Sequence, residues 1–155
     1  MSAPQGLVPL PRRGFTLIEL MFVVVIIGIL ATLIVPAYRG QVYRAQAADV
    51  VARVNAVVLA MKDYESDNDS VPAGTGPVGA PPSYLVPYAR PNLFVGPGTL
   101  TYQLSRPSVG APPTLLIASG SSPGDVQVLL IAARVLGPIA YTIGGGQSVG
   151  VTLPY

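Results

Sequence analysis

The chain has 155 residues, half of them hydrophobic, with nine Lys and Arg against seven Asp and Glu. It contains no cysteine and no histidine, which excludes disulfides, thiolate zinc sites and catalysis by a histidine base. We therefore expect one modest folded domain that is not an enzyme and that holds neither a metal nor a cofactor.

Residues 1–14, with the sequence MSAPQGLVPLPRRG, contain three prolines and no periodicity. We interpret them as a leader that is cleaved off rather than as part of the fold. Without Arg12 and Arg13, the charges of the remaining chain balance at seven of each sign. No basic surplus is left that would indicate nucleic-acid binding.

A continuous apolar segment of 21 residues runs from Phe15 to Val35, and Glu19 is its only charged residue. A helix of this length covers about 30 Å, which is the thickness of the hydrocarbon core of a bilayer. In lipid the backbone must satisfy its own hydrogen bonds, so we expect residues 15–36 to form a transmembrane helix. Glu19 is costly there, and it is either a neutral residue at the interface or an acid that needs a cationic partner.

The residues Gly14-Phe15-Thr16-Leu17-Ile18-Glu19-Leu20-Met21 resemble the processing site of type IV pilins and of the pseudopilins of type II secretion. The resemblance implies that a prepilin peptidase cuts between Gly14 and Phe15 and methylates the new amino terminus at Phe15. It implies that Glu19 pairs with the terminal amine of a neighbouring subunit during filament assembly. The resemblance extends through the apolar segment to Gly28 and Pro36.

Arg12-Arg13-Gly14-Phe15 also resembles the twin-arginine export signal. However, the apolar run is longer than the usual 7–15 residues of a secretory signal, it carries an acid, and no clear Ala-x-Ala site follows. These features favour the pilin interpretation.

Counting Lys and Arg does not orient the segment, because Arg39, Arg44 and Arg53 follow it. The resemblance places the amino terminus in the cytoplasm and the protein in the inner membrane, where a bilayer and an assembly platform are its partners. After assembly it places the protein in a periplasmic or cell-surface filament.

Residues 37–70 are predicted to continue the same helix with one apolar face. The apolar positions at helical spacing are Tyr43, Ala47, Val50, Val54, Val57, Met61 and Tyr64. Asp49 and Arg53 are expected to pair at i,i+4. No proline lies between Ala37 and Val71, so we expect one helix from Phe15 to Ser66, kinked at Pro36 or loosened toward Gly28.

Residues 71–155 are interpreted as a globular head. Its first part, 72–98, holds seven prolines and five glycines, but it is too apolar for a free linker. We expect an ordered loop pinned by Tyr84, Leu85, Tyr88, Leu93 and Phe94.

Alternation and turn residues predict four strands in the rest of the head: Thr99–Ser105, Thr114–Ala118, Ile139–Ile143 and Val149–Leu153. The second is expected to be buried on both faces. Ser122, Pro123 and Asp125 predict the start of a helix that ends at Gly137-Pro138. The predicted fold class is therefore α+β, with a long amino-terminal helix packed on a small antiparallel sheet of about four strands.

Three motifs in the head are interpreted as structural. Gly74-Thr75-Gly76-Pro77-Val78-Gly79 matches the dinucleotide fingerprint, but no helix can open at Pro77. Gly120-Ser121-Ser122-Pro123-Gly124 matches the nucleophile elbow, but the chain offers no histidine base. The acids of Asp63–Asp69 lack the Gly and Glu positions of an EF-hand loop and indicate a solvated helix end with at most weak cation binding.

These observations together predict a structural filament subunit. The resemblance covers type IV pili, type II secretion pseudopili and DNA-uptake filaments alike. The alternative is a minor pilin that acts as a membrane-anchored binding head for DNA or a secreted substrate. In that case Arg90, Arg106 and Arg134 would be the exposed residues to test.

Overall fold

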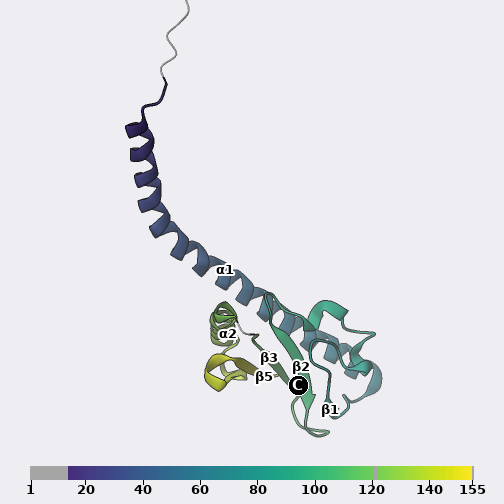
Figure 1. Ribbon diagram of the computed structural model, residues 1–155. Helices are drawn as coiled ribbons and strands as arrows, with labels where there is room; N and C mark the ends of the chain where they lie inside the picture. Colours follow the sequence, from purple (N-terminus) through teal and green to yellow (C-terminus); the bar gives the residue numbers. More distant parts are fainter. Residues whose placement is uncertain (1–13, 121, 155) are drawn as a thin grey trace, which may run out of the picture. The chain divides into compact units, whose positions relative to one another are not determined.

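The computed structural model describes residues 14–120 and 122–154. The leader predicted over residues 1–14 therefore lies outside the described residues except for Gly14. The chain divides into two compact units, Met1–Tyr38 and Arg39–Tyr155. The division falls within the first helix, α1 (Leu17–Asn68), which contains Pro36 (Figure 1).

In the first unit, residues 14–38 are exposed on every side. By length and composition, α1 is the one helix in the described residues that could cross a membrane, and its apolar window is unburied. Apolar side chains that nothing in their own unit covers require lipid or other protein around them. The prediction of one long helix is confirmed, with its start and end two residues later than expected.

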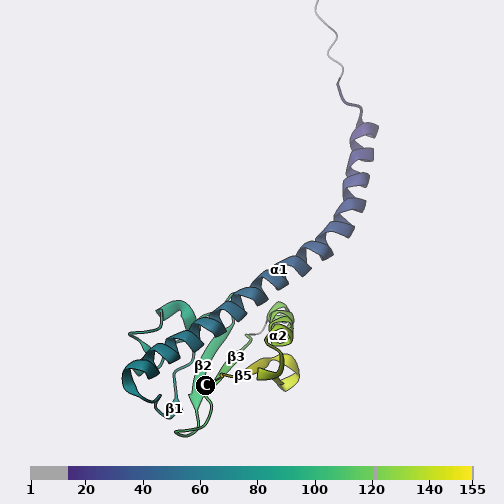
Figure 2. The same ribbon diagram turned by 180° about the vertical axis from the view of Figure 1, so that it is seen from behind.

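The second unit contains a five-stranded antiparallel sheet with the order β1-β2-β3-β5-β4 (Figures 1 and 2). The strands are β1 (Gly74–Thr75), β2 (Thr101–Arg106), β3 (Thr114–Ala118), β4 (Ala140–Ile143) and β5 (Ser148–Thr152). The four predicted strands are present, and β1 is the addition. It has two residues, too few to show an alternating pattern, and it pairs Gly74 with Arg106.

The core of the head forms where alternate strand residues meet the apolar face of α1. Tyr102, Leu104, Leu115, Ile117, Val149 and Val151 are buried on the strands. Ala47, Val50, Val54, Val57 and Met61 are buried on α1, as the helical spacing predicts. The expectation that Thr114–Ala118 is buried on both faces is wrong. Leu115 and Ile117 are buried, but Leu116 on the opposite face is only half-buried, so one face of the strand packs in the core.

The second helix, α2 (Pro123–Leu136), connects β3 to β4 and buries Val128, Leu129 and Ala132. It ends as predicted at Gly137, which has φ +69° and whose N–H donates to the Ala133 carbonyl. Ser122 stands at the N-cap position and Pro123 begins the helix, as predicted, although the Ser122 side chain makes no capping hydrogen bond. Asp125 turns instead toward Thr99, whose N–H lies 3.3 Å from Oδ2.

The loop of residues 72–98 is ordered and carries two short 3-10 helices, η1 (Ser83–Leu85) and η2 (Pro91–Phe94). Leu85, Ala89 and Phe94 are buried in the core of the head, which confirms that apolar residues pin this loop.

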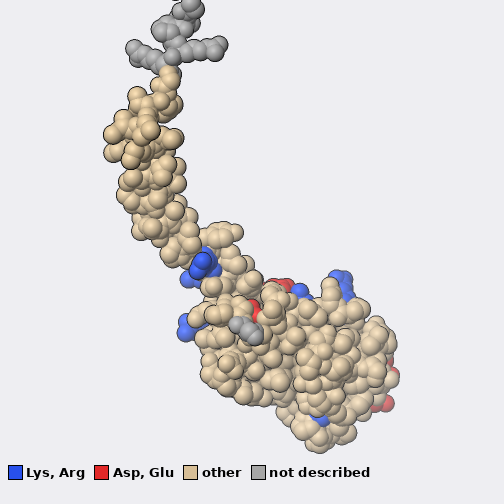
Figure 3. Space-filling model, viewed as in Figure 1, with Lys and Arg blue, Asp and Glu red and all other residues tan. Residues whose placement is uncertain are grey.

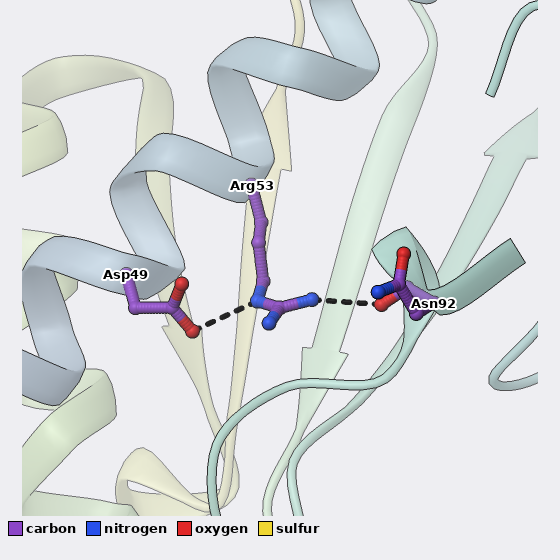
Figure 4. A network of polar contacts seen from close by, with 3 residues as sticks. All are labelled: Asp49, Arg53 and Asn92. Atoms are coloured by element: carbon purple, nitrogen blue, oxygen red, sulfur yellow. Dashed lines mark hydrogen bonds and ion pairs between the residues drawn. The ribbon is translucent and has the colours of Figure 1, made fainter. Parts of the chain in front are cut away.

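Arg53 connects the loop to α1 (Figure 4). Its Nε lies 2.9 Å from Asp49 Oδ2, and its Nη1 donates to the Asn92 carbonyl at 2.8 Å. The i,i+4 pair predicted from the sequence is therefore present, and it extends to η2.

Candidate processing and assembly site

The start of α1 is organised by a reciprocal pair of hydrogen-bonding residues, Thr16 and Glu19. The Thr16 N–H and hydroxyl donate to Glu19 Oε2 at 2.9 and 2.8 Å, and the Glu19 N–H lies 3.3 Å from Thr16 Oγ1. This is a capping box, which satisfies amide groups that the first helical turn leaves unpaired. The pattern Thr-x-x-Glu before an apolar run is its sequence signature, and the sequence analysis missed it.

The other carboxylate oxygen of Glu19 remains available for a partner. Every hydrogen bond to Glu19 among the described residues ends on Oε2 or the backbone, which leaves Oε1 open. Glu19 lines a surface hollow of about 370 Å³ together with Phe15, Ile18, Phe22 and Val23. These residues share one side of the helix start, so Phe15 and Glu19 border the same hollow. A cation entering it would meet a fixed carboxylate between apolar walls.

Gly14 precedes this turn, and the described residues leave open space around it. A Cβ built on Gly14 would have nothing within 4 Å. Packing within the described residues therefore does not require a glycine at this position.

Gly28 and Pro36 both lie inside α1, which is assigned as a single helix through both positions. A Cβ on Gly28 would meet nothing within 4 Å, so this glycine leaves a notch on the helix surface. Small residues of this kind permit close approach of a second helix in a membrane. The kink expected at these residues stays a prediction.

The three arginines considered for substrate binding do not form one group. Arg90 and Arg134 are exposed, but Arg106 is 5% exposed, so its selection as an exposed residue is wrong. Its guanidinium donates to the Val71 carbonyl and, through Nε, to the Ala111 carbonyl at 3.0 Å. Arg106, at the end of β2, therefore binds both the backbone after α1 at Val71 and the turn before β3 at Ala111. Because it sits at an alternating inward position, strand periodicity could have indicated its burial.

One acid at the end of α1, Asp67, is held by a contact with the loop of residues 72–98. The Tyr88 hydroxyl donates to Asp67 Oδ2 at 2.8 Å, and this hydrogen bond raises the pKa of Tyr88. Tyr64 packs against the rings of Tyr84 and Tyr88, with ring centroids 5.2 and 5.5 Å apart. Within residues 14–120 and 122–154, no group of three or more His, Cys, Asp or Glu side chains could hold a metal ion.

The two glycine motifs of the head belong to structural elements. Gly74 and Thr75 form β1, and no helix opens within residues 76–79. In the second motif Ser122 and Pro123 begin α2, while Ser121 lies outside the described residues.

Comparison with known proteins identifies the family that shares this amino-terminal segment. Residues 10–35 match the profile described as the prokaryotic N-terminal methylation motif. A type IV major fimbrial protein FimA of Dichelobacter nodosus is 31% identical over 134 residues, covering 81% of this chain and 79% of that protein. Type II secretion system core protein G of Klebsiella michiganensis is 44% identical over 61 residues, covering 39% of this chain and 43% of that protein.

A second FimA of Dichelobacter nodosus is 42% identical over 71 residues, and there the match spans 44% of each chain. The chain thus spans less than half of some curated relatives and about four fifths of another. No solved structure matches it.

An apolar helix headed by a methylation motif, followed by an α+β head, defines the class of prepilin-type proteins. Given the long match to a fimbrial protein, the chain belongs to the type IV pilin and type II secretion pseudopilin family.

Proposed function

We propose that this protein is a structural subunit of a type IV pilus-like or type II secretion pseudopilus filament. It is stored in the inner membrane through residues 15–36, with its amino terminus in the cytoplasm, and is then transferred into the filament. The transfer exchanges lipid for neighbouring helices around an apolar surface that is exposed over its whole length.

Processing is the first step of the proposed function. A prepilin peptidase cuts between Gly14 and Phe15 and methylates the amino group of Phe15. The support is the position of the bond: it lies before the first helical residue, Leu17, in a segment without helical structure, and nothing lies within 4 Å of a Cβ built on Gly14. An extended, accessible peptide is what a protease needs in order to bind and cut.

Assembly then uses Glu19. The ammonium group of Phe15 in one subunit enters the hollow beside Glu19 of its neighbour and pairs with the open Oε1. Thr16 holds the carboxylate in place before the partner arrives, so less conformational freedom is lost on pairing. A buried ion pair adds little net stability but discriminates strongly between alignments, so Glu19 fixes the offset between subunits.

The observation that carries this proposal is the fixed carboxylate in an apolar hollow beside the scissile bond. In cells that contain the peptidase, mass spectrometry of the protein should show a chain that begins at N-methylated Phe15. A chain that keeps its first fourteen residues there would contradict the proposal. A chain that starts beyond Val35 would indicate ordinary export instead.

Glu19→Gln tests the assembly step separately from processing. The glutamine can still accept from Thr16, so α1 should form and enter the membrane, while the loss of charge removes the attraction for the ammonium. We expect normal cleavage and insertion, with filament yield reduced by tenfold or more, about the effect of one lost ion pair in a dry site. Asp63→Asn, which removes an exposed acid of the same helix, is the control. Wild-type filament yield from Glu19→Gln would refute the role in alignment.

A further inference from the structure

Two arginines that follow the apolar segment have no role in the processing and assembly site. Arg39 and Arg44 are exposed on α1, and neither makes a hydrogen bond or ion pair within the described residues. No acid lies between Glu19 and Asp49, and Asp49 is engaged by Arg53 at 2.9 Å. In Figure 3, Lys and Arg atoms are visible both on the helix and on the head.

These charges are unfavourable for the proposed orientation of the helix. Lys and Arg within 15–20 residues of a span favour the cytoplasmic side, yet Arg39 and Arg44 lie on the opposite side from the leader. Neutral polar residues at these exposed positions would avoid the penalty. A favourable interaction on the side of the membrane opposite the cytoplasm, strong enough to offset this penalty, would explain why arginines stand at these two positions.

The helical rise places both side chains near lipid headgroups. Arg39 comes four residues after Val35 and Arg44 nine, which corresponds to about 6 and 13 Å of helix. The headgroup region extends roughly 5–8 Å beyond the hydrocarbon on each side, and a long arginine stem reaches several ångströms further. Tyr38, the preceding residue, is 68% exposed and is of the type that prefers this layer.

We propose that Arg39 and Arg44 bind the phosphate groups of anionic phospholipids in the leaflet next to the head. The planar guanidinium donates two parallel hydrogen bonds to a phosphate, a geometry that lysine cannot match. Five residues correspond to about 140° around a helix, so the two arginines contact different lipid molecules. They fix the depth of the stored subunit and release the lipids when it is extracted. This inference rests on the membrane storage in the proposed function.

The test uses the full chain reconstituted into vesicles of phosphatidylcholine and phosphatidylglycerol that contain a trace of photoactivatable lipid of either type. Peptide mass spectrometry gives the adduct yield over residues 37–48 for each lipid, and the ratio of the two yields is the measured preference. We expect wild type to prefer phosphatidylglycerol, and each of Arg39→Gln and Arg44→Gln to lower the preference by about fivefold. The Lys variants should keep part of it. High salt should lower the preference of the wild type and leave the double Gln variant unchanged.

Arg90→Gln is the matched control, because it removes an exposed arginine of the 72–98 loop, 46 residues after Arg44 in the sequence, and it should change nothing. An unchanged preference in the double Gln variant overturns the lipid proposal. If that variant keeps its lipid preference and loses filament formation, the arginines bind a neighbouring subunit instead. If the wild-type chain yields no lipid adducts over residues 15–36, the membrane storage itself is wrong, which separates the two failures.

Discussion

Asp125 is the only acidic residue after Asp69 and is 7% exposed. Its Oδ2 accepts hydrogen bonds from the Thr99 N–H and hydroxyl, and it sits at the positive end of α2. Gly98 and Gly120 leave the space for this contact: an added Cβ at Gly98 would lie 2.7 Å from Asp125 Oδ1, and one at Gly120 would clash with Thr99 Oγ1. The carboxylate thus attaches the end of the 72–98 loop to α2.

Asp125→Ala should destabilise the head by about 1 kcal/mol, because it removes the hydrogen bonds that the exposed Thr99 donates to the buried Asp125 carboxylate. Urea denaturation of the full chain in detergent, followed by circular dichroism, measures this change. Asp63→Ala is the control, since Asp63 is exposed on α1, and it should stay within about 0.5 kcal/mol of wild type. Equal midpoints for the two variants would show that the contact contributes nothing.

Tyr102 makes the stability of the head depend on pH in the alkaline range. It is fully buried, its hydroxyl has no hydrogen-bond partner within the described residues, and burial raises its pKa well above the usual value. Unfolded tyrosine loses its proton near pH 10, while the folded one stays neutral to higher pH. The unfolded state therefore binds fewer protons above pH 10, and stability is complete below that pH and falls as the pH rises toward the folded pKa.

We expect the free energy of unfolding to fall by up to about 1.4 kcal/mol per pH unit above pH 10 because of this one group. Tyr102→Phe should flatten that slope at no cost in stability, because it removes an unpaired buried hydroxyl. Tyr141→Phe, at a residue that is 47% exposed, should leave the slope as it is. Denaturant titrations at several pH values provide the measurement, and identical slopes for wild type and Tyr102→Phe would contradict it.

Among the elements, those with a local pattern could be predicted from the sequence. The apolar face of α1, the inward residues of β2 and the end of α2 at Gly137 each follow from periodicity or backbone preference within a few residues. The Thr16–Glu19 capping box was equally local and could have been found. The pairing of β1 and the turn of Asp125 toward Thr99 depend on residues 26 or more positions apart, which only the chain topology brings together.

Arg53 connects α1 to η2. Its ion pair with Asp49 was predicted from the sequence, but its hydrogen bond to the Asn92 carbonyl was not. Arg53→Gln keeps a polar side chain but removes both the pair with Asp49 and the bond to the Asn92 carbonyl. We expect a loss of roughly 1 kcal/mol, because the guanidinium is partly exposed and solvent screens the pair. Hydrogen exchange should quicken at the amides of η2 and at Val95. Lys62→Gln, which removes an exposed cation of the same helix, should leave these amides unchanged, and equal exchange in both variants would exclude the link.

At the scale of the whole molecule, the two units have opposite requirements. Residues 14–38 expose apolar side chains throughout and need lipid or neighbouring helices. The buried residues of the second unit, Arg39–Tyr155, all come from Ala47 onward among the described residues, so its core does not use the apolar segment. Sequence patterning places a change of environment near Pro36, because the apolar residues lie all round the helix before it and on one face after it. One helix can therefore serve two environments in succession.

Residues 39–155 should accordingly fold alone as a soluble monomer with a helical circular dichroism signal and cooperative unfolding. A shorter fragment, 56–155, is the matched comparison, because it lacks Val50 and Val54, which are almost fully buried on α1. Each of these valines contributes roughly 1.5–3 kcal/mol of burial, a large share of the 5–15 kcal/mol that stabilises a typical domain. The shorter fragment should therefore unfold or aggregate, while analytical ultracentrifugation shows the longer one monomeric. Aggregation of 39–155, or equal stability of both fragments, would mean that the head does not use the second half of α1 as its core helix.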